Sequence, residues 1–208
     1  PCLLCLDSIH IYASANLVQL FDCCGGFICT NCSEDLLRKS GQSRCPLCRS
    51  PLVEKATKER VMKLAKRGTP WAQTNVGYLL NHGIGGFQKD EEGGLEWTNK
   101  AAAQNHPSGV FSLSKLYLKG LSSVLRKSQE KANELLLKSA NLGFSPANAE
   151  LARHYFYGEN GFEKDLDEAY FRASVALALD EKDLLSSYLK GALHYIESGA
   201  PERSPYLA

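Results

Sequence analysis

The feature that most constrains this chain is the placement of its eight cysteines. All eight lie within the first 48 residues, and the following 160 residues contain none. A segment of about 50 residues rarely buries enough apolar surface to fold unaided, so such small domains usually depend on disulfides or bound metal. We therefore expect the two parts of the chain to be stabilised by different means.

The spacing of the cysteines favours metal over disulfides. Three pairs have the C-x-x-C spacing that lets both thiolates of a tight turn reach one ion, and an adjacent pair would complete the set. Eight thiolates satisfy two tetrahedral zinc ions with none left over. Disulfides remain an alternative that would need an oxidising compartment. The predicted ligands are Cys2, Cys5, Cys23, Cys24, Cys29, Cys32, Cys45 and Cys48.

The order of these cysteines resembles the RING-type zinc finger. It runs C-x-x-C, a loop of 17 residues, a cysteine pair, C-x-x-C, a loop of 12 residues and then C-P-L-C-R. RING fingers usually have a histidine among the middle ligands, and glycine stands in its place here. The resemblance therefore implies an all-cysteine variant in which Cys24 replaces that histidine.

The RING resemblance also implies that the ligands interleave in a cross-brace. Four-thiolate sites are closed, so they would be structural and leave no coordination position for hydrolytic chemistry. Metal binding and folding of the module would then be one event. The implied ligand sets are Cys2, Cys5, Cys29 and Cys32 for one zinc, and Cys23, Cys24, Cys45 and Cys48 for the other.

A RING ligase positions a ubiquitin-charged conjugating enzyme without forming a covalent bond to ubiquitin. The resemblance implies that Leu4, Leu36 and Pro46 contact the conjugating enzyme. It assigns the catalytic role to Arg49, whose planar guanidinium would brace ubiquitin through several directed hydrogen bonds. The same residues also suit a small core, a tight turn and a solvated cation. A zinc-binding interaction scaffold without ligase activity is therefore the alternative function.

From residue 53 onward, apolar residues recur at helical spacing and the chain repeats itself. Residues 83–90 match residues 158–165, which lie 75 positions later, and residues 120–127 form a degenerate copy between them. A helix is predicted on each side of every copy. One helix pair cannot bury its apolar face alone, so neighbouring pairs must stack.

Particular residues in each repeat have predictable structural roles. Small residues before each loop let two helices approach closely, and the glycine that opens the loop suits a left-handed helix end. Asp90 and Asp165 are expected to cap the helices that follow. A large apolar residue should fill the space beneath each loop. The predicted close-approach residues are Gly77, Ser114 and Ala152, the loop glycines Gly83, Gly120 and Gly158, and the loop anchors Phe87, Val124 and Phe162.

The pattern A-x-x-x-L-G-x-x-Y-x-x-G, followed by a glycine-rich loop and a second helix, resembles the Sel1-like repeat. That family forms α-solenoids related to tetratricopeptide arrays, and the resemblance implies a partner protein, not identified by sequence, on the repeat surface. The expected fold class is mostly α, a small zinc-stapled RING module followed by this solenoid. The expected divisions are a zinc finger at 1–52, a leading helix or linker at 53–69, repeats at 70–199 and a tail at 200–208.

Composition excludes several other functions. Lysine and arginine total 24 against 23 acidic residues, which argues against recruitment to nucleic acid or membranes by bulk charge. Zinc-bound thiolates would add negative charge to the module, which disfavours phosphate binding. No apolar run approaches the length of a membrane span, and no catalytic motif accompanies the repeats. Reduced thiolates imply a cytoplasmic or nuclear location. Because the chain starts at Pro1, we expect further sequence upstream.

Overall fold

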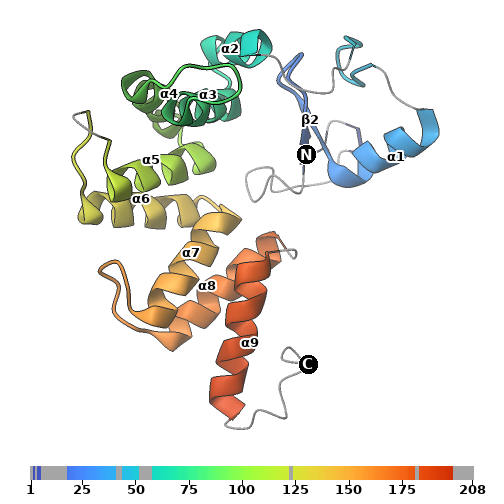
Figure 1. The fold of residues 1–208 in the computed structure, drawn as a ribbon. Helices are drawn as coiled ribbons and strands as arrows, with labels where there is room; N and C mark the ends of the chain where they lie inside the picture. The colour runs from blue at the N-terminus through green and yellow to red at the C-terminus, as the bar shows by residue number, and fades with distance from the viewer. Residues whose placement is uncertain are drawn as a thin grey trace.

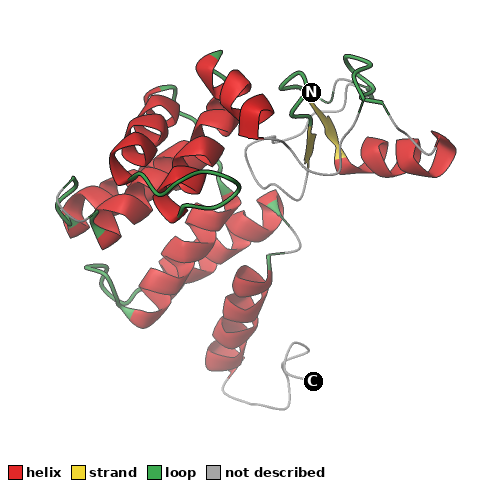
Figure 2. Cartoon of the chain, turned by 45° about the horizontal axis from the view of Figure 1, so that its top comes forward, coloured by secondary structure: helices red, strands yellow, loops and turns green. Residues whose placement is uncertain are grey.

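Two regions of different construction follow one another along the chain. In the computed structural model, strands occur only in the N-terminal region of the described residues, and the rest of the described chain is helices and loops (Figure 2). Within the described residues, no helix combines the length and apolar character needed to cross a membrane. The structure describes residues 2, 4–5, 18–40, 44–51, 58–121, 124–180 and 183–198.

The N-terminal region, which we call the cysteine module, is built around a two-stranded antiparallel sheet. Strand β1 (Val18–Leu20) pairs with β2 (Phe27–Cys29), and helix α1 (Thr30–Ser40) follows directly. The register places Val18 opposite Cys29, so the turn between the strands carries the adjacent cysteines. The buried core of the module consists of Cys2, Phe21, Ile28, Cys29 and Cys45.

The remaining helices form an array in which consecutive helices pack side by side. The closest packing is within the pairs α3–α4, α5–α6 and α7–α8, and the chain proceeds from α2 to α9 without returning to an earlier pair (Figure 1). The helices are α2 (Lys58–Lys66), α3 (Pro70–His82), α4 (Glu91–Ala103), α5 (Pro107–Lys119), α6 (Gln129–Asn141), α7 (Ser145–Tyr157), α8 (Leu166–Leu179) and α9 (Leu184–Ser198).

The second helix of each pair begins with a side-chain cap. The carboxylates of Asp90 and Asp165 accept hydrogen bonds from backbone N–H groups in the first turns of α4 and α8, which confirms both predictions. Ser128 caps α6 in the same way, and the sequence analysis did not identify it. The first helix of each pair instead has a proline in its first turn, where no backbone donor is lost.

Close contact between α3 and α4 requires glycine at two helical positions and confirms the predicted role of Gly77. A Cβ atom on Gly77 would lie 2.4 Å from Thr98 Oγ1 and 2.9 Å from the Gly94 carbonyl oxygen. A Cβ atom on Gly94 would in turn overlap the Asn81 side chain. These glycines lower intrinsic helix propensity, but they let the two helix backbones approach each other.

The predicted loop anchors are correct in two repeats and wrong in the third. Phe87 is buried in the first core cluster, and Phe162 packs against the cluster of α6 and α7. Val124 is 39% exposed, whereas Leu121 is buried. Leu121 and Leu125 form an isolated β-bridge, and in this arrangement Leu121 is buried while Val124 faces outward.

The loop glycines also differ between repeats. Gly83 and Gly158 end α3 and α7 in the left-handed helical conformation, as predicted. Gly120 also has a positive φ of 77°, which favours glycine, but its ψ of 164° lies outside the left-handed helical conformation that was predicted. The middle loop therefore departs from the other two at both its glycine and its apolar anchor.

The cysteine module contacts the start of the helical array through one turn. Trp71 Nε1 donates a hydrogen bond of 3.3 Å to the Gly25 carbonyl oxygen, and Arg60 lies 3.6 Å from the Asp22 carboxylate. Leu64 packs beneath Gly25. The same turn carries Cys23 and Cys24, so these two cysteines lie near the start of the helical array. The predicted tail at 200–208 and residues 52–57, where the predicted leading helix or linker begins, lie outside the described residues.

Candidate metal centres and partner groove

The fold brings the eight cysteine sulfurs together in two groups. Within each group, all sulfur atoms lie within 4.8 Å of one another. Both groups combine cysteines that are distant in sequence. The membership is that of the implied cross-brace: Cys2, Cys5, Cys29 and Cys32 in the first group, and Cys23, Cys24, Cys45 and Cys48 in the second.

The sulfur separations fit a tetrahedral zinc site better than a disulfide. With a Zn–S bond of about 2.3 Å, the edge of a tetrahedron of sulfurs is about 3.8 Å, whereas a disulfide needs about 2.05 Å. Cys5 Sγ lies 3.8 Å from Cys29 Sγ, and the second group has separations of 3.4 Å and 4.0 Å. All eight cysteines are free thiols in the structure. The two groups could therefore bind metal, and their role as zinc ligands stays a prediction.

Backbone N–H groups point at the sulfurs of the first group. Cys2 Sγ accepts from the backbone of Cys29 at 3.4 Å and of Leu4 at 3.5 Å, and Cys29 Sγ accepts from Cys32. Hydrogen bonds from neutral donors stabilise a thiolate without neutralising its charge. The turns thus favour the anionic sulfur that zinc requires.

The thiols have unequal proton affinities. Burial of Cys2 raises its pKa, but the backbone donors of Cys29, Cys5 and Leu4 outweigh it and bring the pKa down to about 6. Hydrogen bonds from Ser50 lower the pKa of Cys48 to about 6. Burial instead raises the pKa of Cys23. A metal ion must displace a proton from such a raised thiol, so metal affinity should increase with pH.

The residues implied to contact a conjugating enzyme differ in exposure. Leu4 is 42% exposed, and Arg49 is exposed with a left-handed backbone (φ of 63°) that follows from the tight turn begun at Cys45. Pro46 is half-buried. Leu36 is also half-buried and packs against the cysteine core, so it contributes to the module's own packing. None of these contacts identifies a partner.

An open groove of about 370 Å³ lies between α5, α7 and the beginning of α9. An ion pair of 2.6 Å between Lys115 and Glu150 joins α5 to α7 across it. The groove therefore combines apolar surface with charges of both signs. We call it the repeat groove, and its lining residues are Phe111, Lys115, Pro146, Ala149, Glu150, Arg153, Asp183 and Leu185.

Two histidines of the repeats are buried in structural positions. His154 Nδ1 lies 3.1 Å from a carboxylate oxygen of Glu159, and its ring stacks on Phe162. His106 precedes α5 and lies 3.0 Å from the Ser108 hydroxyl. Burial lowers the pKa of both and brings that of His106 to about 4. Each ring is neutral at pH 7 and helps to hold a helix end in place.

Helix pairs stacked in a row define an α-solenoid, and comparison with known families identifies its type. The family model for the Sel1 repeat matches residues 72–106, 107–144 and 145–171, and these three helix pairs are Sel1 repeats. The match begins after α2, so the cysteine module and α2 lie outside it. The RING resemblance consequently depends on the cysteine spacing and the sulfur geometry.

Solved structures with the same fold support this assignment. A Sel1 repeat protein from Oxalobacter formigenes has a TM-score of 0.61 at 21% identity, covering 77% of this chain and 45% of that chain. A protective antigen from uropathogenic Escherichia coli strains with an SLR fold has a TM-score of 0.57 at 24% identity, covering 72% and 31%.

One curated relative is the chitin synthase regulator SKT5 of Saccharomyces cerevisiae. It is 28% identical over 138 residues, which cover 62% of this chain and 20% of the yeast protein. The chain therefore spans about a fifth of the length of this relative.

Proposed function

We propose that this protein is an interaction scaffold whose Sel1 repeats bind a partner protein in the repeat groove. The single observation that carries this proposal is the groove itself, which is lined by α5 and α7, the first helices of two successive repeats, and by the beginning of α9. Phe111 and Leu185 offer apolar contact, while Lys115 and Arg153 can orient an acidic group. The name of the yeast relative, a regulator of an enzyme, supports a role that works through protein contact.

A pair of matched variants tests the repeat groove. Leu185 lines the groove and Leu142 lies outside it, and both are 37% exposed. We expect Leu185→Arg to abolish capture of specific partners by the full chain, whereas Leu142→Arg retains them. Quantitative mass spectrometry of captured proteins identifies the candidates, and calorimetry with a purified candidate measures direct binding. Equal loss in both variants, or in neither, would contradict the proposal.

In this proposal two zinc ions stabilise the fold of the cysteine module. Both sites would be structural, with no catalytic role. Cys2, Cys5, Cys29 and Cys32 would hold one ion, and the other four cysteines the second. Because the thiols must stay reduced for this role, the protein would work in the cytoplasm or the nucleus. Native mass spectrometry of the full chain should detect two zinc ions. A mass loss that indicates disulfides would contradict both the metal and the location.

A RING-type ubiquitin ligase is a second candidate, and the interleaved grouping of the sulfurs favours it. The exposed Leu4 would contact the conjugating enzyme together with Pro46, and Arg49 would brace the conjugated ubiquitin. The module would then position the thioester so that a lysine amine attacks its carbonyl carbon and the conjugating enzyme's cysteine leaves. Leu36 would act as a core residue beneath this surface.

Discharge of ubiquitin from a charged conjugating enzyme onto free lysine tests the ligase candidate. The zinc-loaded chain should accelerate discharge with at least one enzyme of a panel. Leu4→Ala and Arg49→Ala should each remove most of that acceleration without changing zinc content, and the exposed Arg44→Ala serves as control. If no enzyme responds, the scaffold without ligase activity remains.

A further inference from the structure

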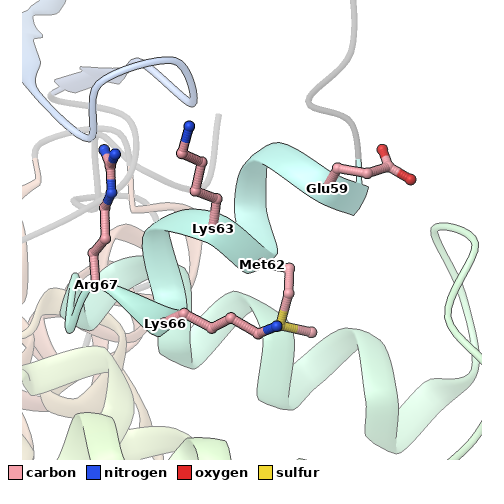
Figure 3. A pocket seen from close by; sticks show the side chains of 5 residues that line it. All are labelled: Glu59, Met62, Lys63, Lys66 and Arg67. Atoms are coloured by element: carbon pink, nitrogen blue, oxygen red, sulfur yellow. The ribbon is translucent and has the colours of Figure 1, made fainter.

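Helix α2 presents a basic surface that lies outside the Sel1 repeats. Val61, Leu64 and Ala65 bury one side of the helix in the core shared with α3. Another part of the helix surface borders an open groove of about 500 Å³. We call it the α2 groove, and it is lined by Glu59, Met62, Lys63, Lys66 and Arg67 (Figure 3).

The cations of the α2 groove have no partner within the described part of the chain. Lys63, Lys66 and Arg67 make no ion pair or side-chain hydrogen bond there. The neighbouring cations differ, since Lys58 donates to the Gly86 carbonyl oxygen and Arg60 pairs with Asp22. Like charges three and four residues apart repel each other on a helix. The three cations thus form a positive surface, and the Glu59 carboxylate that also lines the groove makes no ion pair with any of them within the described residues.

The geometry of the groove adds to this charge. Lys63 and Arg67 extend in the same direction from consecutive turns, and Met62 contributes an apolar wall (Figure 3). The helix dipole favours cations in the last turn and accounts for two lysines there. It does not account for the groove, whose apolar wall is the outer side of Met62, a half-buried residue that also packs against the core of α2 and α3.

We propose that the α2 groove binds an acidic peptide segment of a partner protein. Carboxylates of the segment would pair with the three cations, and an apolar side chain would rest against Met62. Charge complementarity identifies the occupant, since the groove offers three cations against the single carboxylate of Glu59.

Two features favour a peptide over a nucleic acid or a lipid surface. Glu59 lies within the groove and repels any polymer with a phosphate at every position. Three cations also support only a few phosphate contacts, which is little for stable binding at physiological salt. A short peptide can place its carboxylates on the cations and an apolar residue on Met62 while avoiding Glu59.

This surface is distinct from the repeat groove on α5, α7 and α9. It precedes the first matched Sel1 repeat at residue 72, and no residue lines both grooves. The α2 proposal therefore stands independently of the partner proposed for the repeats. A variant of one groove should leave binding at the other unchanged.

Fluorescence anisotropy with the zinc-loaded full chain tests the proposal. The probe is a short labelled peptide of glutamates around a central leucine, and the same peptide with glutamine in place of glutamate is the control. The triple charge reversal Lys63→Glu, Lys66→Glu and Arg67→Glu should weaken binding at least about tenfold. The triple substitution of these residues by glutamine should also weaken binding, but by a smaller factor. Such a graded loss of affinity is expected if charge, and not misfolding, is responsible.

A matched triple reversal elsewhere controls for net charge. Lys119→Glu, Arg126→Glu and Lys138→Glu change the same residue types at exposed positions far from α2 in sequence, and they should leave binding unchanged. Equal loss in this control would overturn the proposal, because bulk charge would then explain binding. Tighter binding of labelled oligouridine, or of phosphatidylserine vesicles, than of the peptide would also overturn it. A Leu185→Arg variant that retains peptide binding separates this result from the repeat groove.

Discussion

The cysteine module and the helical array have cores made of different residue types. Cysteines make up three of the five buried residues that form the module's core, whereas the clusters of the array consist of side chains such as Leu136, Ala147 and Leu151. A core of this kind buries little apolar surface, so we expect the module to depend on metal bound by its sulfurs. Each helix pair of the array instead depends on its neighbours. Neither a module of about 50 residues nor a single helix pair is expected to bury enough apolar surface to fold alone. The two adjacent parts of this chain meet that requirement in different ways.

The two regions nevertheless meet at one turn. The Trp71 indole bonds to the backbone of Gly25, next to the adjacent cysteines, and Arg60 pairs with Asp22. These contacts are few and partly exposed, so we expect weak coupling between the regions. The following experiments perturb one region and measure the other.

Removal of metal should have the largest effect and separate the two regions completely. A strong chelator would take away about 10 kcal/mol or more of binding free energy per site, which the module cannot replace. We expect amides of residues 18–51 to lose protection in hydrogen exchange while α3–α8 keep theirs. Re-addition of zinc should restore the module. Protection that is unchanged throughout the module would contradict its dependence on metal.

Leu151→Ala should damage the array and leave the module intact. Leu151 is fully buried in the cluster between α6 and α7, so the cavity should lower the free energy of unfolding by about 2–5 kcal/mol. Chemical denaturation followed by circular dichroism measures the loss. Leu184→Ala is the matched control, because Leu184 is 84% exposed and should change stability by less than about 0.5 kcal/mol. Zinc content should stay at two ions in both variants.

Mild acid should weaken the array through His106. Burial lowers the pKa of its ring to about 4, below the unfolded value of 6.5. The unfolded chain then binds a proton that the folded chain does not, so stability is present above pH 6.5 and is lost as the pH falls toward 4. The loss between pH 7 and pH 5 should reach about 1–2 kcal/mol. His106→Gln should remove this part of the pH dependence, and parallel curves for both proteins would contradict it.

Trp71→Phe should have the smallest effect and measures the coupling itself. The change deletes one hydrogen bond to the Gly25 carbonyl oxygen, which contributes about 1 kcal/mol. Hydrogen exchange should increase in the turn at residues 21–26. Trp97→Phe is the control, since Trp97 packs in the same cluster of the array. Faster exchange across the whole module would show that the two regions are more strongly coupled than their few contacts indicate.

The repeats were largely predictable because each copy carries the same pattern of apolar, small and capping residues. Three copies of a spaced pattern specify where helices begin, where they cross and where they end, and the caps at Asp90 and Asp165 follow from that pattern. The prediction that Val124 is a loop anchor was wrong. The alignment of the repeats gave it the position of Phe87, but the antiparallel bridge between Leu121 and Leu125 changes the local course of the chain. A degenerate copy carries too few signals to predict its own backbone.

The functional surfaces were less predictable. Charge spacing along residues 63–67 could have signalled the α2 groove, since the cations recur at three and four positions. The repeat groove had no comparable signal, because Phe111, Glu150 and Leu185 come from three different helices. The half-buried position of Leu36 also required the structure, since an apolar residue on a short helix can face either the core or a partner.

The sequence by itself determined the division of the chain, the pairwise helical repeats and the supply of eight thiols, because spacing and composition act locally along the chain. Only the tertiary structure decided which apolar residues stay exposed and that Trp71 reaches the module. These outcomes depend on contacts between residues far apart in sequence. The energies of these contacts come from packing and burial, which exist only after the helices and strands have assembled.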